Sequence, residues 1–471
     1  MGNKWPEFRL DEITTLIADC PHSTPEWTDS GVIVLRSNNI RNGALDLATP
    51  SFTTEEGYLE RIKRAIPSEE DIVLTREAPM GEVCIIPKGI KCCLGQRMVL
   101  IRADKSQVIP EYLLYVMQSS YIQHQISWNE GTGTTVSNIR IPNIKALKIP
   151  LPKITIQRTI VSNLLVIDKK IAINTGINQT LEQMSQTLFK SWFVDFDPVI
   201  DNALDAGNPI PEALQSRAEL RQKVRNCADF KPLPAEIRSL FPSEFEETEL
   251  GWVPKGWSIV RTEDIALKIG MGPFGSNIKV STFVNAGVPI ISGQHLKDPL
   301  LIDGDNNFIT PEHAEKLKNS AVYRKDIIFT HAGNIGQVSL IPEDSEYDRY
   351  IISQRQFFLR VNESKSSPYY LIHYFRSEKG QHALLSNASQ VGVPSIARPS
   401  THLKNISFLN PPMVLLKEFE KFSTPLFHRF SKNRKCGVSL TALRDTLLPK
   451  LISGELSLDD LPDLTTDTEA A

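Results

Sequence analysis

The sequence predicts an α+β protein in which two tandem domains are separated by long helices that form an intramolecular antiparallel coiled coil. Three observations lead to this prediction. The chain of 471 residues contains one long unit twice. The first part of each copy has short β-rich runs broken by Gly, Pro, Asn and Asp. The second part has apolar residues at heptad spacing. With 41% hydrophobic and 23% charged residues the composition is globular, which excludes dominant disorder.

The repeat is visible when the two halves of the chain are aligned. The matching segments are residues 5–13 and 257–265, 31–40 and 287–296, 71–75 and 326–330, and 96–97 and 354–355. The offset between them rises from 252 to 259 because the loops differ in length. Each copy therefore has the same two-part layout, a domain followed by a long helix.

These segments define the expected organisation along the chain. The predicted parts are a first domain at 1–152, a central long helix at 153–197, an acidic Pro-containing connector at 198–250, a second domain at 251–411, a distal long helix at 412–456 and an acidic disordered tail at 457–471. In each domain a helical piece follows the β-rich runs, and a closing strand ended by proline precedes the long helix.

The heptad positions predict how the two long helices pair. The positions in the first copy are Ile160, Ile167, Asn174, Leu181 and Leu188. Adding 259 gives Phe419, Leu426, Asn433, Leu440 and Leu447. A polar residue midway along an apolar seam fixes register, so Asn174 and Asn433 are predicted to pair. Two separate helices, each packed on its own domain, remain the alternative. Pro425 predicts that the second helix is kinked or begins later than the first.

Charge is distributed unevenly along the chain. The net charge is −3, but it becomes +8 when the tail and residues 195–250 are left out. Such a body permits contact with a phosphate backbone. The acids at 195–197 and 244–249 are expected to be solvated or to face a partner.

Six cysteines at no metal-ligand or disulfide-framework spacing favour reduced thiols. No apolar run approaches the roughly 18 residues of a membrane helix. We therefore expect a cytoplasmic protein without membrane association.

Several segments resemble the specificity subunit of type I restriction-modification systems. They are residues 19–25, 181–198, 250–257, 272–279 and 443–456. The resemblance extends over residues 5–456 and implies two target recognition domains in tandem, joined by an antiparallel coiled coil. It departs from the family's minimal pattern in the long stretch 199–250.

The resemblance also implies a function. Such a subunit is not an enzyme itself. It binds double-stranded DNA and directs adenine methylation or restriction by its partners, which are two methylation subunits and, through them, restriction and translocase subunits. S-adenosylmethionine, ATP and Mg²⁺ are expected on those partners, and no cofactor or metal is expected on this chain. Two different domains on a rigid spacer should read an asymmetric two-part target, with the coiled coil as a ruler.

Loop residues of the types that read bases or hold phosphates are the candidate DNA contacts. In the first domain they are Ser37, Asn38, Asn39, Arg41, Arg76, Gln96, Arg97, Thr134, Thr135, Ser137 and Asn138. In the second they are Asn277, Lys279, Gln294, His295, Lys297, His331, Gln354, Arg355 and Ser395. Three alternatives stay open. The repeated Gln-Arg pair could instead be a structural brace shared by both domains. Asn38 and Asn39 could be turn residues. His331 could be an ordinary loop histidine.

Candidate anchors for a partner subunit are Trp192, Phe193 and Phe196, near the end of the first long helix. Packing inside the helix bundle is the alternative for all three.

Two short patterns imitate catalytic motifs. Residues 270–275 spell GxGxxG without the strand–turn–helix context of a dinucleotide site. Residues 410–413 spell Asn-Pro-Pro-Met, where an adenine methyltransferase needs an aromatic residue in the fourth place. We identify no active site. The rival functions are a self-sufficient DNA methyltransferase and a structural adaptor that reads no DNA. Binding of S-adenosylmethionine to the isolated chain would distinguish a methyltransferase from a specificity subunit.

Overall fold

The computed structural model describes residues 5–41, 43–77, 79–129, 138–389 and 392–456. These residues form two compact units. Unit 1 consists of the described residues of Met1–Ile173 and Cys436–Ala471, and unit 2 is Asn174–Lys435. Each unit holds one domain and half of each long helix. Among the described residues, no helix is both long and apolar enough to cross a membrane.

The first domain is built on two sheets. The main sheet has the order β2 (Thr14–Asp19), β10 (Met98–Ala103), β7 (Ile72–Thr75) and β8 (Val83–Ile85), and its neighbours are antiparallel. The second sheet has the order β6 (Ser51–Thr53), β3 (Val32–Leu35) and β9 (Cys92–Leu94), with β3 and β9 parallel. Val, Ile and Leu dominate these strands, as expected for buried sheet faces.

The second domain repeats this topology. Its main sheet runs β15 (Ala266–Met271), β22 (Gln356–Val361), β19 (Ile327–Thr330) and β20 (Val338–Leu340). Its second sheet runs β17 (Asn307–Ile309), β16 (Val288–Ile291), β21 (Tyr350–Ile352) and β18 (Ala321–Val322), with β16 and β21 parallel. The repeat found in the sequence is therefore a repeat of strand order as well.

A helix pair and a closing ribbon complete each domain. The helices are α2 (Pro110–Gln118) with α3 (Ser120–Trp128), and α10 (Pro368–Arg376) with α11 (Glu378–Leu385). The ribbons are β1 (Glu7–Arg9) with β11 (Lys148–Pro150), and β14 (Ser258–Arg261) with β25 (Ser407–Asn410). The hydroxyl of Tyr112 donates to the Pro150 carbonyl, and that of Tyr370 donates to the Leu409 carbonyl. The same bond therefore fixes the helix to the ribbon in both copies.

The remaining elements are short. The helices are α1 (Glu55–Arg61), α4 (Ile141–Lys145), α9 (Pro311–Lys316) and α12 (Pro399–Asn405), and the strands are β4 (Ile40–Arg41), β5 (Ala44–Leu45), β23 (Ala388–Ser389) and β24 (Ser395–Ile396). Single 3-10 turns include η2 (Ser37–Asn39), η5 (Gly275–Asn277), η6 (Val280–Thr282) and η7 (Gly293–His295).

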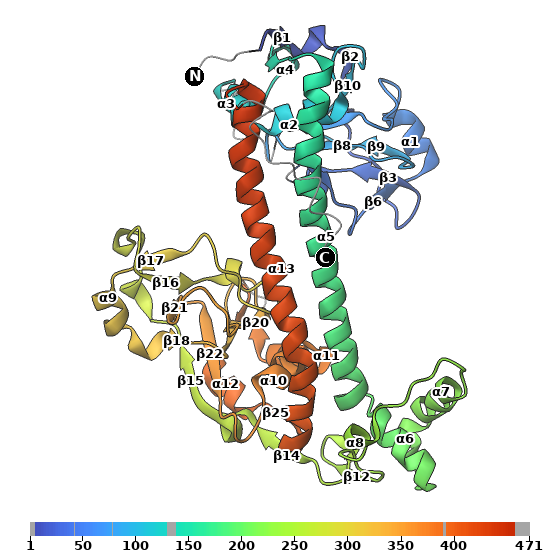
Figure 1. Cartoon of the computed structure of the whole chain (residues 1–471), viewed down its shortest axis with the longest axis vertical. Coiled ribbons are helices and arrows are strands. Elements are labelled where there is room, and N and C mark those ends of the chain that lie inside the picture. Colours follow the sequence, from blue (N-terminus) through green and yellow to red (C-terminus); the bar gives the residue numbers. More distant parts are fainter. Residues whose placement is uncertain (1–4, 42, 78, 130–137, 390–391, 457–471) are drawn as a thin grey trace. The chain divides into compact units, whose positions relative to one another are not determined.

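Two long helices follow the domains, α5 (Ile154–Phe193) and α13 (Met413–Ser453) (Figure 1). In unit 1, Leu164 near the start of α5 shares a core with Leu451 near the end of α13. In unit 2, Trp192 near the end of α5 shares a core with Leu416 near the start of α13. The helices are thus antiparallel within each unit. The expectation that Pro425 delays the second helix is wrong, because α13 begins at Met413 and continues through the proline.

The predicted pairing of Asn174 with Asn433 is corrected by one helical turn. Nδ2 of Asn433 donates to Oδ1 of Asn178 at 3.1 Å, and Nδ2 of Asn178 donates to the Phe430 carbonyl at 3.2 Å. Asn174 is buried, and its Nδ2 has no hydrogen-bond partner among the described residues. Residues four apart lie on one helix face, so Asn178 takes the position on the seam that heptad counting gave to Asn174.

Trp192, Phe193 and Phe196 are core residues, so their prediction as anchors for a partner is wrong. Trp192 is only 1% exposed, and its ring lies 5.2 Å from that of Phe241. Phe193 packs against Tyr370, and Phe196 packs edge-on against Trp257. These large apolar side chains join the end of α5 to the second domain, which is the alternative that the sequence left open.

The connector folds into three helices and a hairpin. They are α6 (Asp197–Ala206), α7 (Gln215–Arg225), α8 (Ala235–Arg238), and β12 (Phe245–Thr248) paired with β13 (Gly251–Pro254). Aspartates on α6 pair with arginines on α7 in the combinations 197 with 217, 201 with 221 and 205 with 225. The expectation that the Asp197 carboxylate is solvated or faces a partner is therefore wrong, because Arg217 neutralises it inside the connector.

Candidate nucleic-acid interface

The loops that carry most predicted DNA contacts meet at one end of the main sheet in the first domain. The register pairs Asp19 at the end of β2 with Val99 near the start of β10, and Thr75 at the end of β7 with Met98. The second sheet ends at the same place, because the amide of Gly95 donates to the carbonyl of Leu35 at 2.7 Å. The loops after β2, β3, β7 and β9 therefore share this end, which we call the loop end of the domain.

The second domain has an equivalent loop end. Met271 at the end of β15 lies opposite Phe357, and Thr330 at the end of β19 lies opposite Gln356. The amide of Ser353 donates to the carbonyl of Ile291 at 2.9 Å, which brings the end of β16 to the same edge. Loops far apart in sequence thus form one surface in each domain.

Part of the predicted set is exposed at or beside these loop ends. Seven of the predicted residues are exposed, and their side chains form no hydrogen bond or ion pair with a described residue. They are Asn38, Arg41, Asn277, Lys279, Lys297, Gln354 and Arg355. Ser37, Asn138 and Ser395 are half-buried. The exposed amide and guanidinium groups without a partner are available to bind base edges, and the lysines are available to bind phosphates.

A second part of the set already has partners within the domain. Arg76 donates to the Ile139 carbonyl at 3.0 Å and to Asp19 at 2.8 Å. Gln96 donates to the carbonyl of His22. These bonds connect neighbouring loops and hold the loop end of the first domain in shape.

Three more predicted residues have similar local bonds. Arg97 forms an ion pair with Glu77 at 3.1 Å while remaining half-exposed. Gln294 donates to the Asp305 carbonyl at 3.2 Å. His331 meets the Gln354 carbonyl at 3.1 Å, and burial lowers the pKa of its imidazole, so it is neutral near pH 7.

Asn39 and His295 are structural residues, which corrects their prediction as DNA contacts. Asn39 is 2% exposed, and its Oδ1 accepts from the amide of Arg36 at 3.0 Å. His295 is buried at the equivalent position, and its Nδ1 accepts from the amide of Ser292 at 2.9 Å. Burial lowers the pKa of His295, which keeps this nitrogen an acceptor. For Asn39, this is the role in a turn that the sequence left open as the alternative.

The repeated Gln-Arg pair has a shared backbone role. The amide of Arg76 donates to the Arg97 carbonyl at 2.8 Å, and the amide of His331 donates to the Arg355 carbonyl at 2.9 Å. The brace common to both copies is therefore made by the main chain. The side chains differ, because Arg97 is paired with Glu77 and Arg355 has no such pair among the described residues. Thr134, Thr135 and Ser137 lie outside the described residues.

Comparison with known proteins agrees with this arrangement. A family model described as "Type I restriction modification DNA specificity domain" matches residues 2–183. The chain is 24% identical over 470 residues to the type I restriction enzyme MjaIX specificity subunit of Methanocaldococcus jannaschii, covering 98% of this chain and 91% of that protein. It is 25% identical over 381 residues to the HindI specificity subunit of Haemophilus influenzae, covering 77% and 81%. The chain is thus similar over nearly its whole length to curated specificity subunits of type I restriction enzymes, and residues 2–183 match the family model.

A solved structure supports the fold of this chain. The crystal structure of the type I restriction-modification S subunit from M. genitalium aligns with a TM-score of 0.50 and 16% sequence identity. The alignment covers 95% of this chain and 96% of that one. At this identity the likeness concerns the fold, which is the two-domain α+β architecture described above.

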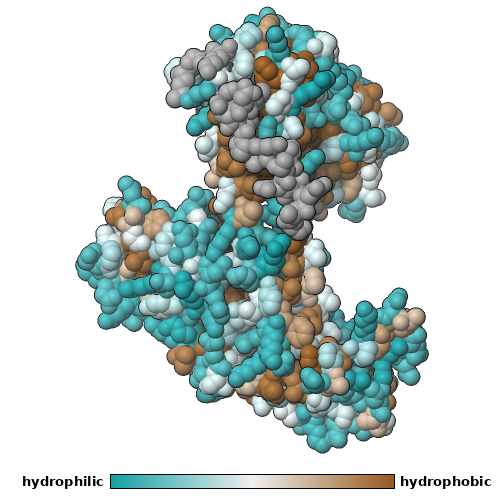
Figure 2. Space-filling model, viewed as in Figure 1, coloured by the Kyte–Doolittle hydropathy of each residue, from teal (hydrophilic) through white to brown (hydrophobic). Residues whose placement is uncertain are grey.

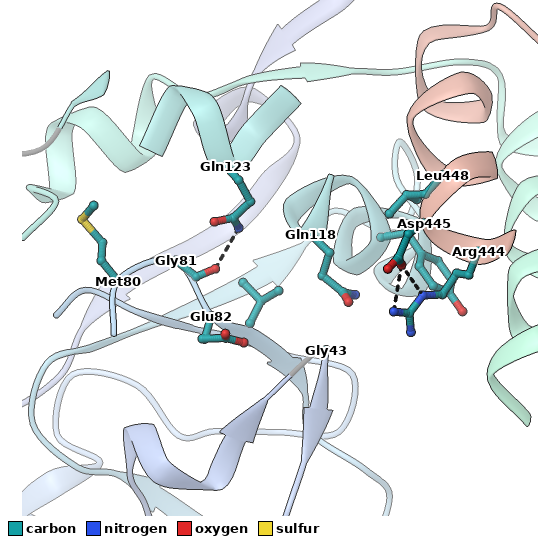
Figure 3. Close-up of a pocket in the computed structure, with 11 residues that line it drawn as sticks. Gly43, Met80, Gly81, Glu82, Gln118, Gln123, Arg444, Asp445 and Leu448 are labelled. Carbon is teal, nitrogen blue, oxygen red and sulfur yellow. Dashed lines mark hydrogen bonds and ion pairs between the residues drawn. The ribbon is translucent and has the colours of Figure 1, made fainter. Parts of the chain in front are cut away.

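The protein also has a cavity of about 340 Å³ in unit 1. Figure 3 shows it between the turn at Gly81 and Glu82, the helix residues Gln118 and Gln123, and Arg444 of α13. The guanidinium of Arg444 is paired with Asp168 at 3.1 Å and with Asp445 at 2.9 Å. Because two carboxylates neutralise this cation, the cavity offers no unpaired Arg444 charge to an anion. The described residues hold no cluster of potential metal ligands.

Sequence reasoning missed two exposed aromatic residues at the loop ends, Trp27 after β2 and Phe274 after β15. The guanidinium of Arg36 lies 5.1 Å from the centre of the Trp27 ring. The available signal was a large aromatic residue in a Gly- and Pro-containing loop, where a turn needs none.

Proposed function

We propose that this chain is the specificity subunit of a type I restriction-modification system and reads an asymmetric two-part DNA target. Each domain would read one half, and the paired helices α5 and α13 would act as the spacer. The observation that carries the proposal is the repeated strand order combined with different exposed side chains at the two loop ends. Duplicated scaffolds with different contact residues suit the reading of two different half-sites.

The chemistry of the loop ends supports contact with DNA. Arg355 and Gln354 provide the group types that bind base edges in pairs of hydrogen bonds, and Lys279 and Lys297 suit phosphates. The net positive charge of the chain outside its acidic connector and tail supports the same partner.

The length of the helices supports their role as a spacer. The 40 residues of α5 correspond to about 60 Å of helix at 1.5 Å per residue. One turn of DNA is about 34 Å, so half-sites more than one turn apart suit such a spacer. The gap in the target is then set by helix length rather than by base contacts.

The enzymatic steps are assigned to partner subunits in this proposal. Two methylation subunits would act on adenine, one for each half of the target, and would connect this chain to restriction and translocase subunits. S-adenosylmethionine, ATP and Mg²⁺ would be bound by those partners, and this chain would be non-catalytic. The names of the relatives, which are specificity subunits of restriction enzymes, support this division of labour.

The surface of the long helices is the proposed docking site for the methylation subunits. Exposed apolar side chains occur on α5 at Met184 and on α13 at Phe422, both in unit 2. Figure 2 shows hydrophobic atoms gathered along the long helices, whereas the visible face of the second domain is mainly hydrophilic. Exposed apolar surface of this kind is typical of a protein contact.

Mapping methylated bases genome-wide in cells that express this chain with its candidate methylation subunits tests the proposal. We expect an asymmetric two-part motif that disappears without this chain. Arg355→Ala should relax one half only, whereas Arg261→Ala, at the opposite end of the second domain, should leave the motif intact. Seven residues inserted into both α5 and α13 should lengthen only the gap.

The same experiment separates the alternatives. Methylation that proceeds unchanged without this chain, or a short continuous motif, would contradict the two-part reading and favour a structural adaptor. A self-sufficient methyltransferase would bind S-adenosylmethionine as an isolated chain, which calorimetry on the purified protein measures directly.

A further inference from the structure

Phe274 is held out of the second domain by a loop that is fixed at both ends. The residue is 79% exposed, although a phenylalanine side chain normally gains free energy by leaving water. Val280, a few residues further on, is also exposed. Single exposed apolar residues are common on protein surfaces, so exposure alone gives Phe274 no role. What sets this residue apart is how its loop is held and where it lies.

The start of the loop is packed under its own domain. A Cβ on Gly272 would lie 1.9 Å from the Ser353 carbonyl oxygen, so only glycine fits this contact. The amide of Gly272 donates to the Gln356 carbonyl at 2.9 Å, and Pro273 is buried. Phe274 is therefore the first residue of the loop that leaves the domain surface.

The far end of the loop is held by α9. Nε2 of His313 donates to the carbonyl of Asn277 at 2.9 Å. Gly275 adopts a φ of +63°, which turns the chain back directly after Phe274. Because the backbone on both sides of Phe274 is already held in place, binding costs less backbone conformational entropy.

The tip lies among the candidate DNA contacts. Gly272 touches the turn that carries Gln354 and Arg355, and Lys279 follows Phe274 in the same segment. A polar reader surface with one projecting aromatic residue matches proteins that insert an apolar wedge between base steps.

We propose that Phe274 is a specificity-determining residue that inserts as a wedge at a base step in the half-site read by the second domain. This inference rests on the proposed function. The wedge discriminates between sequences because the cost of unstacking depends on the base step. The first domain presents similar chemistry in Trp27, which supports an aromatic contact as a general part of such a loop end.

Binding by the full chain in complex with its methylation subunits, on a duplex that carries the mapped motif, tests this inference. Phe274→Ala should weaken binding by about 10-fold, whereas Phe274→Trp should retain affinity. Leu267→Ala is the matched control, because Leu267 is 64% exposed and lies at the opposite end of β15, the strand that precedes Phe274. Thermal unfolding should be the same for all three variants.

Salt dependence and base stacking distinguish a wedge from other contacts. Lys279→Ala should reduce the slope of log K against log salt by about 1, and Phe274→Ala should leave the slope unchanged. A duplex with 2-aminopurine placed across the half-site should brighten at one step with the wild-type complex and stay dark with Phe274→Ala.

Each contrary result has its own meaning. Wild-type affinity for Phe274→Ala, an equal loss on unrelated DNA, or brightening that persists in this variant would overturn the wedge while leaving the proposed function intact. A wild-type complex that fails to prefer the mapped motif would overturn the proposed function, and the wedge with it.

Discussion

Asn433 and Asn178 form a buried hydrogen bond across the two long helices, with 3.1 Å between Nδ2 of Asn433 and Oδ1 of Asn178. Nδ2 of the same Asn178 amide also has a partner, because it donates to the carbonyl of Phe430. One turn earlier on α5, Asn174 is buried with its Nδ2 unpaired among the described residues. The seam therefore contains one amide that stabilises the helix pair and one that does not.

This contrast predicts opposite effects of the same substitution. Asn174→Leu should raise the free energy of unfolding by about 1 kcal/mol, because it removes a buried amide with an unsatisfied donor. Asn433→Leu should lower it by about 1 to 3 kcal/mol, because Asn178 then lacks its partner. Urea unfolding followed by tryptophan fluorescence measures both, and equal shifts would contradict the pairing.

The Asp–Arg pairs of the connector predict a graded response to arginine removal. Arg221→Ala leaves the nearly buried Asp201 carboxylate without its guanidinium and should destabilise the α6–α7 pair by about 2 to 3 kcal/mol. Arg225→Ala should cost less than about 1 kcal/mol, because Asp205 is half-exposed and keeps Arg238. Amide hydrogen exchange in α6 and α7 reports both, and an equal response would show that burial does not govern these pairs.

Trp192 provides a test of its placement in the core. Trp192→Ala should lower the free energy of unfolding by about 3 to 5 kcal/mol, as large core truncations do. Met184→Ala, an exposed position on the same helix, should leave stability nearly unchanged. If Trp192→Ala weakened only the binding of methylation subunits, the residue would be a docking anchor after all. Comparing unfolding curves with subunit binding decides between these outcomes.

Much of the scaffold was predictable because both copies use the same residue for the same purpose. Asp71 pairs with Arg102, and Asp326 pairs with Arg360, each through two charge-assisted hydrogen bonds. Such identities keep their spacing along the chain, so alignment of the two halves finds the repeat and its strands.

The candidate site was less predictable because one role is filled by different residues. Asn39 in the first domain and His295 in the second close equivalent turns with different acceptor atoms. Neither residue type indicates from the sequence that the side chain is buried. Likewise, heptad counting located the polar step of the seam but missed Asn178, since facing residues on antiparallel helices depend on axial offset as well as spacing. Residues that can bind DNA are distinguished from residues that hold the loops by their exposure and their hydrogen-bond partners, and both depend on the three-dimensional structure.

His373 predicts a pH-dependent stability of unit 2. Its ring is buried between α5 and α13, in contact with Ser185 and stacked on Phe427 with 5.3 Å between ring centres. Burial lowers the pKa of His373 to about 4, whereas an unfolded histidine titrates near 6.5. Between these values the unfolded chain binds the extra proton, so stability rises with pH and is lost as pH falls from about 6.5 towards 4, by up to about 3 kcal/mol.

His373→Gln should remove this contribution, and His428→Gln, an exposed position on α13, should not. Urea unfolding at a series of pH values measures the difference, and parallel profiles for wild type and His373→Gln would show that the imidazole is not neutral in the folded unit.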